Sequence, residues 1–170
     1  MHEKQVYEYK VWDLPVRLFH WINFTTVIAL LFFGMVMLFK KELGISATEA
    51  KINLKVVHVT IGYVFLANLA FRIIWGFIGS RYARWRTLLP SGGHMTRVDA
   101  YKQSVKAGAP LQYPGHNPLG QIAVVVIYLC LLIMSVTGLI RAGTDIYFPP
   151  FGSIAAEYVA LPDVDPDSLV

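Results

Sequence analysis

The segment LFHWINFTTVIALLFFGMVMLF, residues 18–39, decides how this chain folds. A helix of roughly 20 apolar residues crosses the hydrocarbon core of a bilayer, and this segment has that length. Two further runs of the same kind follow it, VVHVTIGYVFLANLAFRIIWGFIG at 56–79 and LGQIAVVVIYLCLLIMSVTGLI at 119–140. The sequence therefore predicts an all-α integral membrane protein. We expect one membrane domain over residues 1–170, an antiparallel transmembrane helix bundle of three spans with connecting loops at 80–118 and 141–170, the first of which could hold a short helix at 98–106.

The composition agrees with an integral membrane protein. Hydrophobic residues make up 55% of the 170 residues and charged residues 15%, which is too apolar for a soluble domain of this size. The net charge of +4 does not indicate nucleic-acid binding, because the basic residues lie beside the apolar runs. The first run lacks a small-residue cleavage site, so we expect it to stay as an anchor rather than to be removed as a signal. Cys130 is the single cysteine, so we expect it to serve in packing.

The distribution of Lys and Arg predicts the orientation of the spans. One side carries nine basic residues: Lys4, Lys10, Arg17, Arg81, Arg84, Arg86, Arg97, Lys102 and Lys106. The other side carries five: Lys40, Lys41, Lys51, Lys55 and Arg141. Basic residues are enriched on the cytoplasmic side of membrane proteins. We therefore expect a multi-pass protein of the bacterial inner membrane with a cytoplasmic N-terminus.

Two histidines near the start of consecutive spans are the leading functional candidates. His20 lies three residues into the first run and His58 three residues into the second. Because consecutive spans run in opposite directions, the two imidazoles should lie near opposite faces of the membrane. An ionisable group inside a span is costly and indicates function. We interpret His20 and His58 as ligands of two haem irons.

Two residues should lie at the depths of these histidines. Fourteen residues correspond to about 21 Å, or four helical turns, along one helix face. Gly34 is therefore expected at the depth of His58, where its missing side chain would admit a macrocycle. Arg72 is expected at the depth of His20, where it could pair with a haem propionate. Arg17 and Arg141, at span ends, are weaker propionate candidates.

Ordinary structural roles compete with these interpretations. A histidine in an apolar run can be an interhelical hydrogen bonder, and Gly34 can be a packing residue. Arg72 can extend its guanidinium to the membrane surface, and Trp85 fits an interfacial belt of aromatic residues. His94 and His116, in the loop at 80–118, are expected to be solvated. A haem-free membrane anchor and a transporter-type subunit of a larger complex are the alternative functions, although the polar residues of the spans are too scattered to outline a path.

Three motifs resemble one family of proteins. They are WDLPVRLFHW at 12–21, HVTIGYVFLANLAFRIIWGFIGSRYARW at 58–85 and YPGHNPLG at 113–120. They resemble the prokaryotic di-haem b-type cytochromes, which include bacterial cytochrome b561 and the b-type cytochrome subunit of nickel-iron hydrogenases. The resemblance implies a four-helix bundle with two b haems, in which His20 and His58 each supply one axial ligand. It also implies electron transfer between the quinone pool and a redox partner, either a periplasmic c-type cytochrome or a hydrogenase small subunit, as one component of an oxidoreductase system.

The sequence departs from that family in one respect. Family members carry two further axial histidines on a fourth span, and residues 1–170 hold only three apolar runs. The missing span could come from the rest of the reading frame or from another chain, such as the second copy of a homodimer. His94 and His116 are poor substitutes, because both are expected on the cytoplasmic side and His58 is not.

Overall fold

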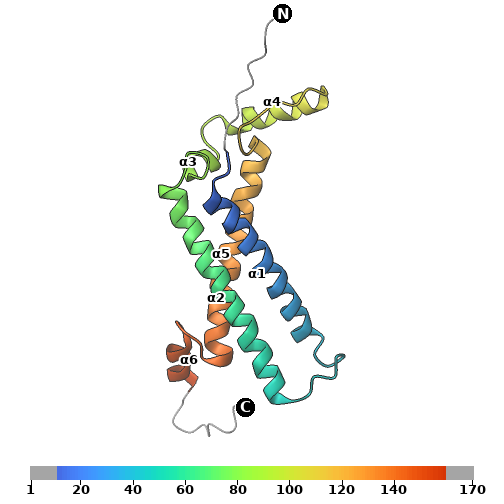
Figure 1. Ribbon diagram of the computed structural model, residues 1–170, viewed down its shortest axis with the longest axis vertical. Helices are drawn as coiled ribbons and strands as arrows, with labels where there is room; N and C mark the ends of the chain where they lie inside the picture. The colour runs from blue at the N-terminus through green and yellow to red at the C-terminus, as the bar shows by residue number, and fades with distance from the viewer. Residues whose placement is uncertain (1–10, 160–170) are drawn as a thin grey trace, which may run out of the picture. The chain divides into compact units, whose positions relative to one another are not determined.

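The computed structural model describes residues 11–159, and every regular element in that part of the chain is a helix (Figure 1). The elements are α1 (Leu14–Leu38), α2 (Thr48–Ile78), α3 (Trp85–Leu88), α4 (His94–Lys106), α5 (Pro118–Ile146) and α6 (Gly152–Val159). The helices α1, α2 and α5 have 25, 31 and 29 residues and are long and apolar enough to cross a membrane. The prediction of an all-α fold with three membrane-crossing helices is confirmed.

Two of the long helices begin at side-chain caps that the sequence encodes. The backbone N–H of Val16 donates to Asp13 Oδ1 over 3.0 Å at the start of α1. The backbone N–H of Gly120 donates to Asn117 Oδ1 over 2.7 Å at the start of α5. Asp and Asn satisfy the free N–H groups of a first helical turn, and Pro118 can occupy the first position of α5 because no intrahelical bond needs its nitrogen. These caps fix where the two apolar helices begin.

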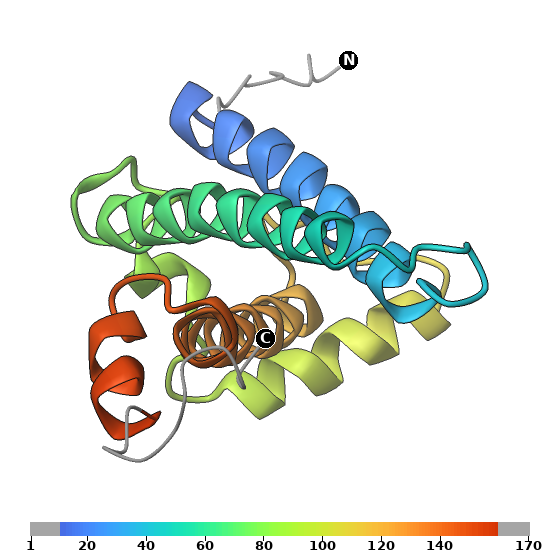
Figure 2. The ribbon, with the colours of Figure 1, turned by 90° about the horizontal axis from the view of Figure 1, so that it is seen from below.

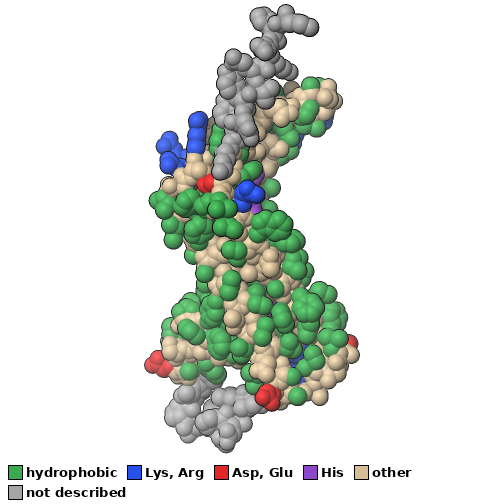
Figure 3. Space-filling model, in the orientation of Figure 1, with side chains coloured by type: hydrophobic (Ala, Val, Ile, Leu, Met, Phe, Trp, Pro, Cys, Tyr) green, Lys and Arg blue, Asp and Glu red, His purple; other side chains and the backbone are tan. Residues whose placement is uncertain are grey.

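The outer surfaces of the long helices are apolar. Large side chains such as Leu31 and Ile133 are about 60% exposed, and many others on α1, α2 and α5 are exposed as well. In Figure 3 hydrophobic side chains cover the visible face of the long helices, whereas charged side chains are seen near the helix ends. In water such a surface would be unstable, but it suits contact with lipid tails.

The chain divides into two compact units. Within the described residues, unit 1 comprises 11–21 and 69–129, and unit 2 comprises 22–68 and 130–159. Unit 1 thus contains the start of α1, the end of α2, α3, α4 and the first part of α5. Unit 2 contains the remaining parts of α1, α2 and α5, together with α6.

Segments predicted as loops hold short helices. In unit 1, α4 includes residues 98–106, where the sequence indicates a short helix, and it begins four residues earlier. In unit 2, α5 continues past residue 140 to Ile146, and α6 folds back beside its end (Figure 2). The return is tight, since a Cβ on Gly143 would come within 2.7 Å of Phe151. This glycine lets α6 approach a helix end that the sequence did not mark as a packing site.

Candidate functional sites

Unit 2 contains a partly open apolar cavity of about 480 Å³ lined by α1, α2 and α5. This volume lies within the range of roughly 300–1,000 Å³ that is usual for cofactor sites. His58 is the one imidazole among its lining residues. Three glycines also line it, Gly34, Gly62 and Gly138, one from each helix. The cavity is therefore widened at positions where any other residue would project a side chain.

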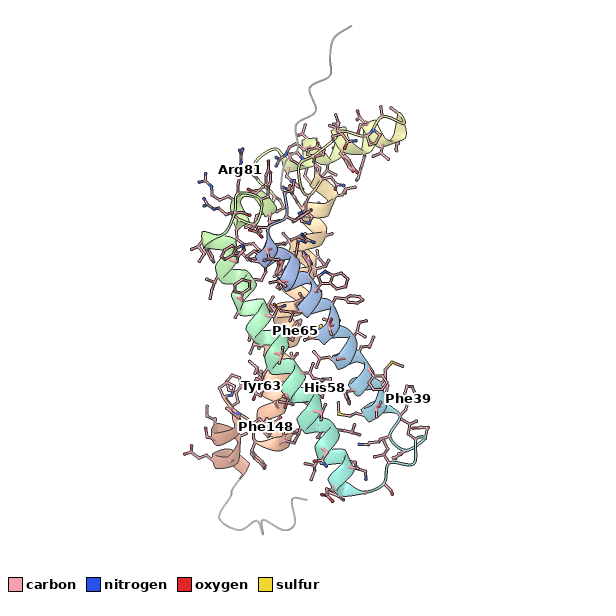
Figure 4. All side chains as sticks on the ribbon, in the orientation of Figure 1. Phe39, His58, Tyr63, Phe65, Arg81 and Phe148 are labelled. Carbon is pink, nitrogen blue, oxygen red and sulfur yellow. The ribbon has the colours of Figure 1, made fainter. Side chains whose placement is uncertain are left out.

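His58 and Gly34 lie next to each other in the wall of this cavity. A Cβ added to Gly34 would lie 3.7 Å from His58 Cε1, which is an ordinary contact distance. The structure thus brings together the two residues that the fourteen-residue spacing assigned to one depth. Figure 4 shows His58 on α2, one turn before Tyr63, and Phe65 beyond it. The Nδ1 atom of His58 is buried and has no hydrogen-bond partner within residues 11–159.

Charged groups near this cavity are engaged with one another. The Asp145 carboxylate lies 3.5 Å from Lys55 Nζ and 3.1 Å from Arg141 Nε. The Arg141 side chain is 77% exposed. Arg141, predicted as a weaker propionate candidate, is thus already paired and points to solvent. The Tyr63 hydroxyl donates to the carbonyl oxygen of Pro149, which ties α2 to the segment before α6.

Unit 1 has a different centre, the buried guanidinium of Arg72. Its side chain is only 3% exposed, and Nη2 donates to the carbonyl oxygen of Ala83 over 3.1 Å. The guanidinium carbon lies over the rings of Phe19, Trp85 and Tyr128, 5.9, 5.3 and 5.8 Å from their centres. A cation over an aromatic face gains roughly 0.5–2 kcal/mol. Arg72 therefore does not extend to the membrane surface, as one interpretation of the sequence allowed.

Arg72 keeps unused hydrogen-bonding capacity in this aromatic cage, which we define as Phe19, Trp85 and Tyr128. Its Nη1 is buried and lacks a hydrogen-bond partner in the described part of the chain. A buried charged donor without a partner is costly. The site thus fits an anionic group, and a haem propionate has the required carboxylate.

His20 lies beside this cage on the exposed flank of α1. Its ring meets that of Phe19 edge to face, with centres 5.4 Å apart. Phe19 in turn lies against Arg72, so one aromatic ring connects the imidazole with the guanidinium. His20 and Arg72, which the sequence places at one depth, thus lie against the same Phe19 ring. Arg17 is exposed and is not part of the cage.

The two loop histidines differ from the expectation that they are solvated. His94 is only 8% exposed, and both its ring nitrogens are buried without a hydrogen-bond partner among residues 11–159. His116 is half-buried and packs edge to face on Trp12, with ring centres 5.0 Å apart. Burial lowers the pKa of His116, and its proximity to the His20 imidazole and the Arg72 guanidinium lowers it further. The expectation was wrong because the position of both histidines in a polar loop does not reveal how that loop packs within unit 1.

Sequence reasoning missed the residues that hold Arg72 in place. Trp85 Nε1 donates to the carbonyl oxygen of Ile73 over 3.0 Å, and a Cβ on Gly76 would lie 2.2 Å from that indole nitrogen. The sequence favoured an interfacial belt as the role of Trp85. Trp85 follows Arg72 by thirteen residues with glycines between them, a pattern that indicates a chain reversal. Only the fold shows that the Trp85 ring lies over the guanidinium.

These features by themselves define a class of protein. Membrane-crossing helices with imidazoles in apolar surroundings, a cofactor-sized cavity and a buried cation fit the helical membrane haem proteins. A family model described as prokaryotic cytochrome b561 matches residues 11–162. The chain therefore belongs to the prokaryotic cytochrome b561 family, and haem b is the cofactor of this class.

Curated relatives agree with this family. The chain is 30% identical over 142 residues to a protein of Azotobacter chroococcum mcd 1, covering 75% of the chain and 57% of the relative. A Rhizobium leguminosarum bv. viciae protein is 31% identical over 140 residues, with the same coverage. An Escherichia coli (strain K12) protein is 28% identical over 142 residues, covering 78% and 60%. The first two are named probable Ni/Fe-hydrogenase B-type cytochrome subunits and the third a probable Ni/Fe-hydrogenase 1 B-type cytochrome subunit. The chain spans less than two thirds of their length, and no solved structure matches it.

Proposed function

We propose that this chain is the membrane b-type cytochrome of a hydrogenase-like system and passes electrons between its redox partner and the quinone pool through two haems. The observation that carries the proposal is the apolar cavity of unit 2, which has the volume of a cofactor site and has His58 and Gly34 next to each other in its wall. The relatives' names favour a hydrogenase small subunit over a periplasmic c-type cytochrome as the partner.

The residues of the chain would act on the cofactors by holding them and excluding water. Haem iron supplies the one-electron chemistry, while the protein sets orientation, dielectric and hydrogen bonding. His58 and His20 would each hold one haem iron through a neutral imidazole. The largely apolar lining of the unit 2 cavity would pack against the macrocycle, and Arg72 Nη1 would offer a charge-assisted hydrogen bond to a propionate. Arg17 and Arg141 remain weaker candidates for that role.

Each iron would need a second imidazole, which we assign to a further span. Such a span would run beside α1, α2 and α5 and present two imidazoles about 21 Å apart, or roughly fourteen residues. The relatives extend well beyond the matched length, which leaves room for it. A second copy of the chain in a homodimer is the other source. His116 is near His20, whereas nothing in the contacts of unit 2 gives His58 an imidazole partner among the described residues.

Haem content tests the ligand assignment. His20→Ala and His58→Ala in the full reading frame should each lose one of two haems per protein, measured as pyridine haemochrome against protein mass. His94→Ala is the matched control, because it removes a buried imidazole that has no place in either proposed site. Unchanged haem content in either test variant contradicts the assignment. A reduced-minus-oxidised spectrum of the unaltered protein without b-type bands would instead favour a haem-free anchor or a transporter-type subunit.

Orientation has its own test, since the proposal places the protein in the bacterial inner membrane with a cytoplasmic N-terminus. Cys130→Ser provides a background free of cysteine over residues 1–170. In it, Gly93→Cys should resist membrane-impermeant thiol reagents in intact cells, whereas Ser153→Cys should react. Both positions are exposed, so a difference reports the side of the membrane rather than burial. The opposite labelling pattern would invert the topology.

A further inference from the structure

The positive charge of Arg72 is not neutralised by any acidic side chain that the structure describes. The ion pairs found within residues 11–159 are those of Lys55 and Arg141 with Asp145. Arg72 instead contacts one backbone carbonyl and three aromatic rings. Such contacts accommodate a guanidinium but leave its unit charge intact. Unit 1 therefore contains a full buried charge beside His20.

A short return segment creates this environment. After α2 ends at Ile78, residues 79–85 fold back so that the Ala83 carbonyl meets Arg72 and the Trp85 ring covers it. Two further bonds hold the fold-back, from Arg84 Nε to the Gly79 carbonyl and from Trp85 Nε1 to the Ile73 carbonyl. Gly76 provides the groove that the indole enters. Trp85 is thus fixed both to the helix and over the guanidinium.

We propose that Trp85 is a positioning residue that holds the Arg72 guanidinium beside His20, and that this charge, which no acidic side chain among residues 11–159 pairs with, raises the reduction potential of the haem at His20 above that of the haem at His58. The proposal rests on the proposed function, because it needs a haem at each histidine. It assigns to the return segment an electrochemical role as well as a structural one.

The direction follows from electrostatics. Reduction lowers the charge of a haem by one, so a nearby fixed cation stabilises the reduced form. The effect is large where water is excluded, because the effective dielectric is low and salt does not screen a buried charge. In unit 2 the cations near His58 are paired with Asp145, and the cavity lining is uncharged. At any one ambient potential, the reduced fraction of the haem at His20 should therefore exceed that of the haem at His58.

The test is a potentiometric titration of the full-length protein followed by its haem spectrum. Arg72→Gln should shift the oxidised-to-reduced ratio of the haem at His20 at least tenfold toward oxidised, about 59 mV for one electron. Arg72→Lys keeps the charge and should restore most of the difference. Trp85→Ala should shift the same haem in the same direction by a smaller factor. Added to Arg72→Gln, it should shift the potential no further, because its effect acts through Arg72.

Trp75 supplies the matched control. It is an indole on the same unit that also donates a hydrogen bond, to Asp13 Oδ2 over 3.1 Å, but it has no contact with Arg72 among those recorded within residues 11–159. Trp75→Ala should leave both potentials unchanged. The haem at His58 should be unaffected in every variant, and it is identified by its loss in His58→Ala.

The possible failures are distinguishable. Absence of haem from the unaltered protein would refute the proposed function. Two haems with no shift in Arg72→Gln, or equal shifts in Trp75→Ala and Trp85→Ala, would refute the positioning role alone. If Trp85→Ala fails to assemble, Trp85→Phe removes the hydrogen bond but keeps a ring. In that case an unchanged potential in Arg72→Gln overturns the proposal, and a lowered potential in both Arg72→Gln and Trp85→Phe supports it.

Discussion

The two candidate sites of this chain differ in what surrounds their polar group, His58 in unit 2 and Arg72 in unit 1. In unit 2 the space around His58 is left open, with a glycine from each of three helices at its wall. In unit 1 Arg72 is surrounded by three aromatic rings and a backbone carbonyl, and its buried Nη1 lacks a hydrogen-bond partner among the described residues. An open apolar cavity can accept a large ligand but does little to set its charge. A filled cage sets a local charge but leaves its neighbour His20 exposed.

The largest expected effect concerns the open site. Gly34→Leu should fill the cavity beside His58 and remove the haem of unit 2, while the haem at His20 is retained. Gly34→Ala is the control, because its Cβ would lie 3.7 Å from His58 Cε1 and make an ordinary contact. Haem per protein distinguishes the variants. Full haem content in Gly34→Leu would mean that the cavity is not the binding site.

The next effect concerns the filled site. Gly76→Ala places a methyl group 2.2 Å from Trp85 Nε1, so the indole or the helix must move. Overpacking of this kind usually costs about 1–3 kcal/mol of unfolding free energy. Gly62→Ala in unit 2 is the matched change, because a Cβ there meets nothing within 4 Å. Thermal unfolding in detergent should rank Gly76→Ala clearly below Gly62→Ala. Equal stabilities would show that Trp85 is loosely held.

A smaller effect is expected at Asp13, which joins the start of α1 to the end of α2 within unit 1. Burial alone would raise the pKa of the Asp13 carboxyl, but the donors beside it, among them the hydrogen-bonded Val16 N–H and Trp75 indole, outweigh burial and lower the pKa below its ordinary 3.8. A lowered folded-state pKa contributes stability above the ordinary value, and this stability is lost as the pH falls below it. Asp13→Asn keeps a capping side chain but cannot titrate.

The measurement for Asp13 is the melting temperature against pH. The unaltered protein should lose stability below about pH 3.8. Asp13→Asn should be less stable near neutral pH and should lose less over the acid range. Parallel curves for the two proteins would show that the carboxylate does not support the start of α1.

The smallest effect is expected at the rim of unit 2. Arg141 is largely exposed and pairs with Asp145, and exposed ion pairs contribute roughly 0–1 kcal/mol. Arg141→Gln should therefore change the melting temperature little and leave haem content intact. Arg17→Gln should behave in the same way, because Arg17 is exposed. Loss of one haem in either variant would restore that arginine as a propionate partner.

Local sequence was sufficient for the helices and for the pairing of His58 with Gly34. Apolar runs of 22 residues, capped by Asp13 and Asn117, determine membrane-crossing helices because backbone groups in lipid must bond within the helix. The regular rise of a helix then converts sequence separation into depth, so positions fourteen apart in antiparallel spans can be matched from the residue numbers alone.

Tertiary structure alone decided the environment of Arg72, the burial of His94 and the return of α6. All three features depend on how irregular segments fold back. The direction of such a segment is set by contacts between residues distant in sequence, not by helical periodicity. Trp85 illustrates the difference: its sequence suggests a ring at a membrane surface, whereas its hydrogen bond to Ile73 and the groove at Gly76 place it over a buried cation. Helical periodicity thus determined which residues share a depth. Long-range packing determined that Arg72 is buried among aromatic rings, with no acidic partner among the described residues.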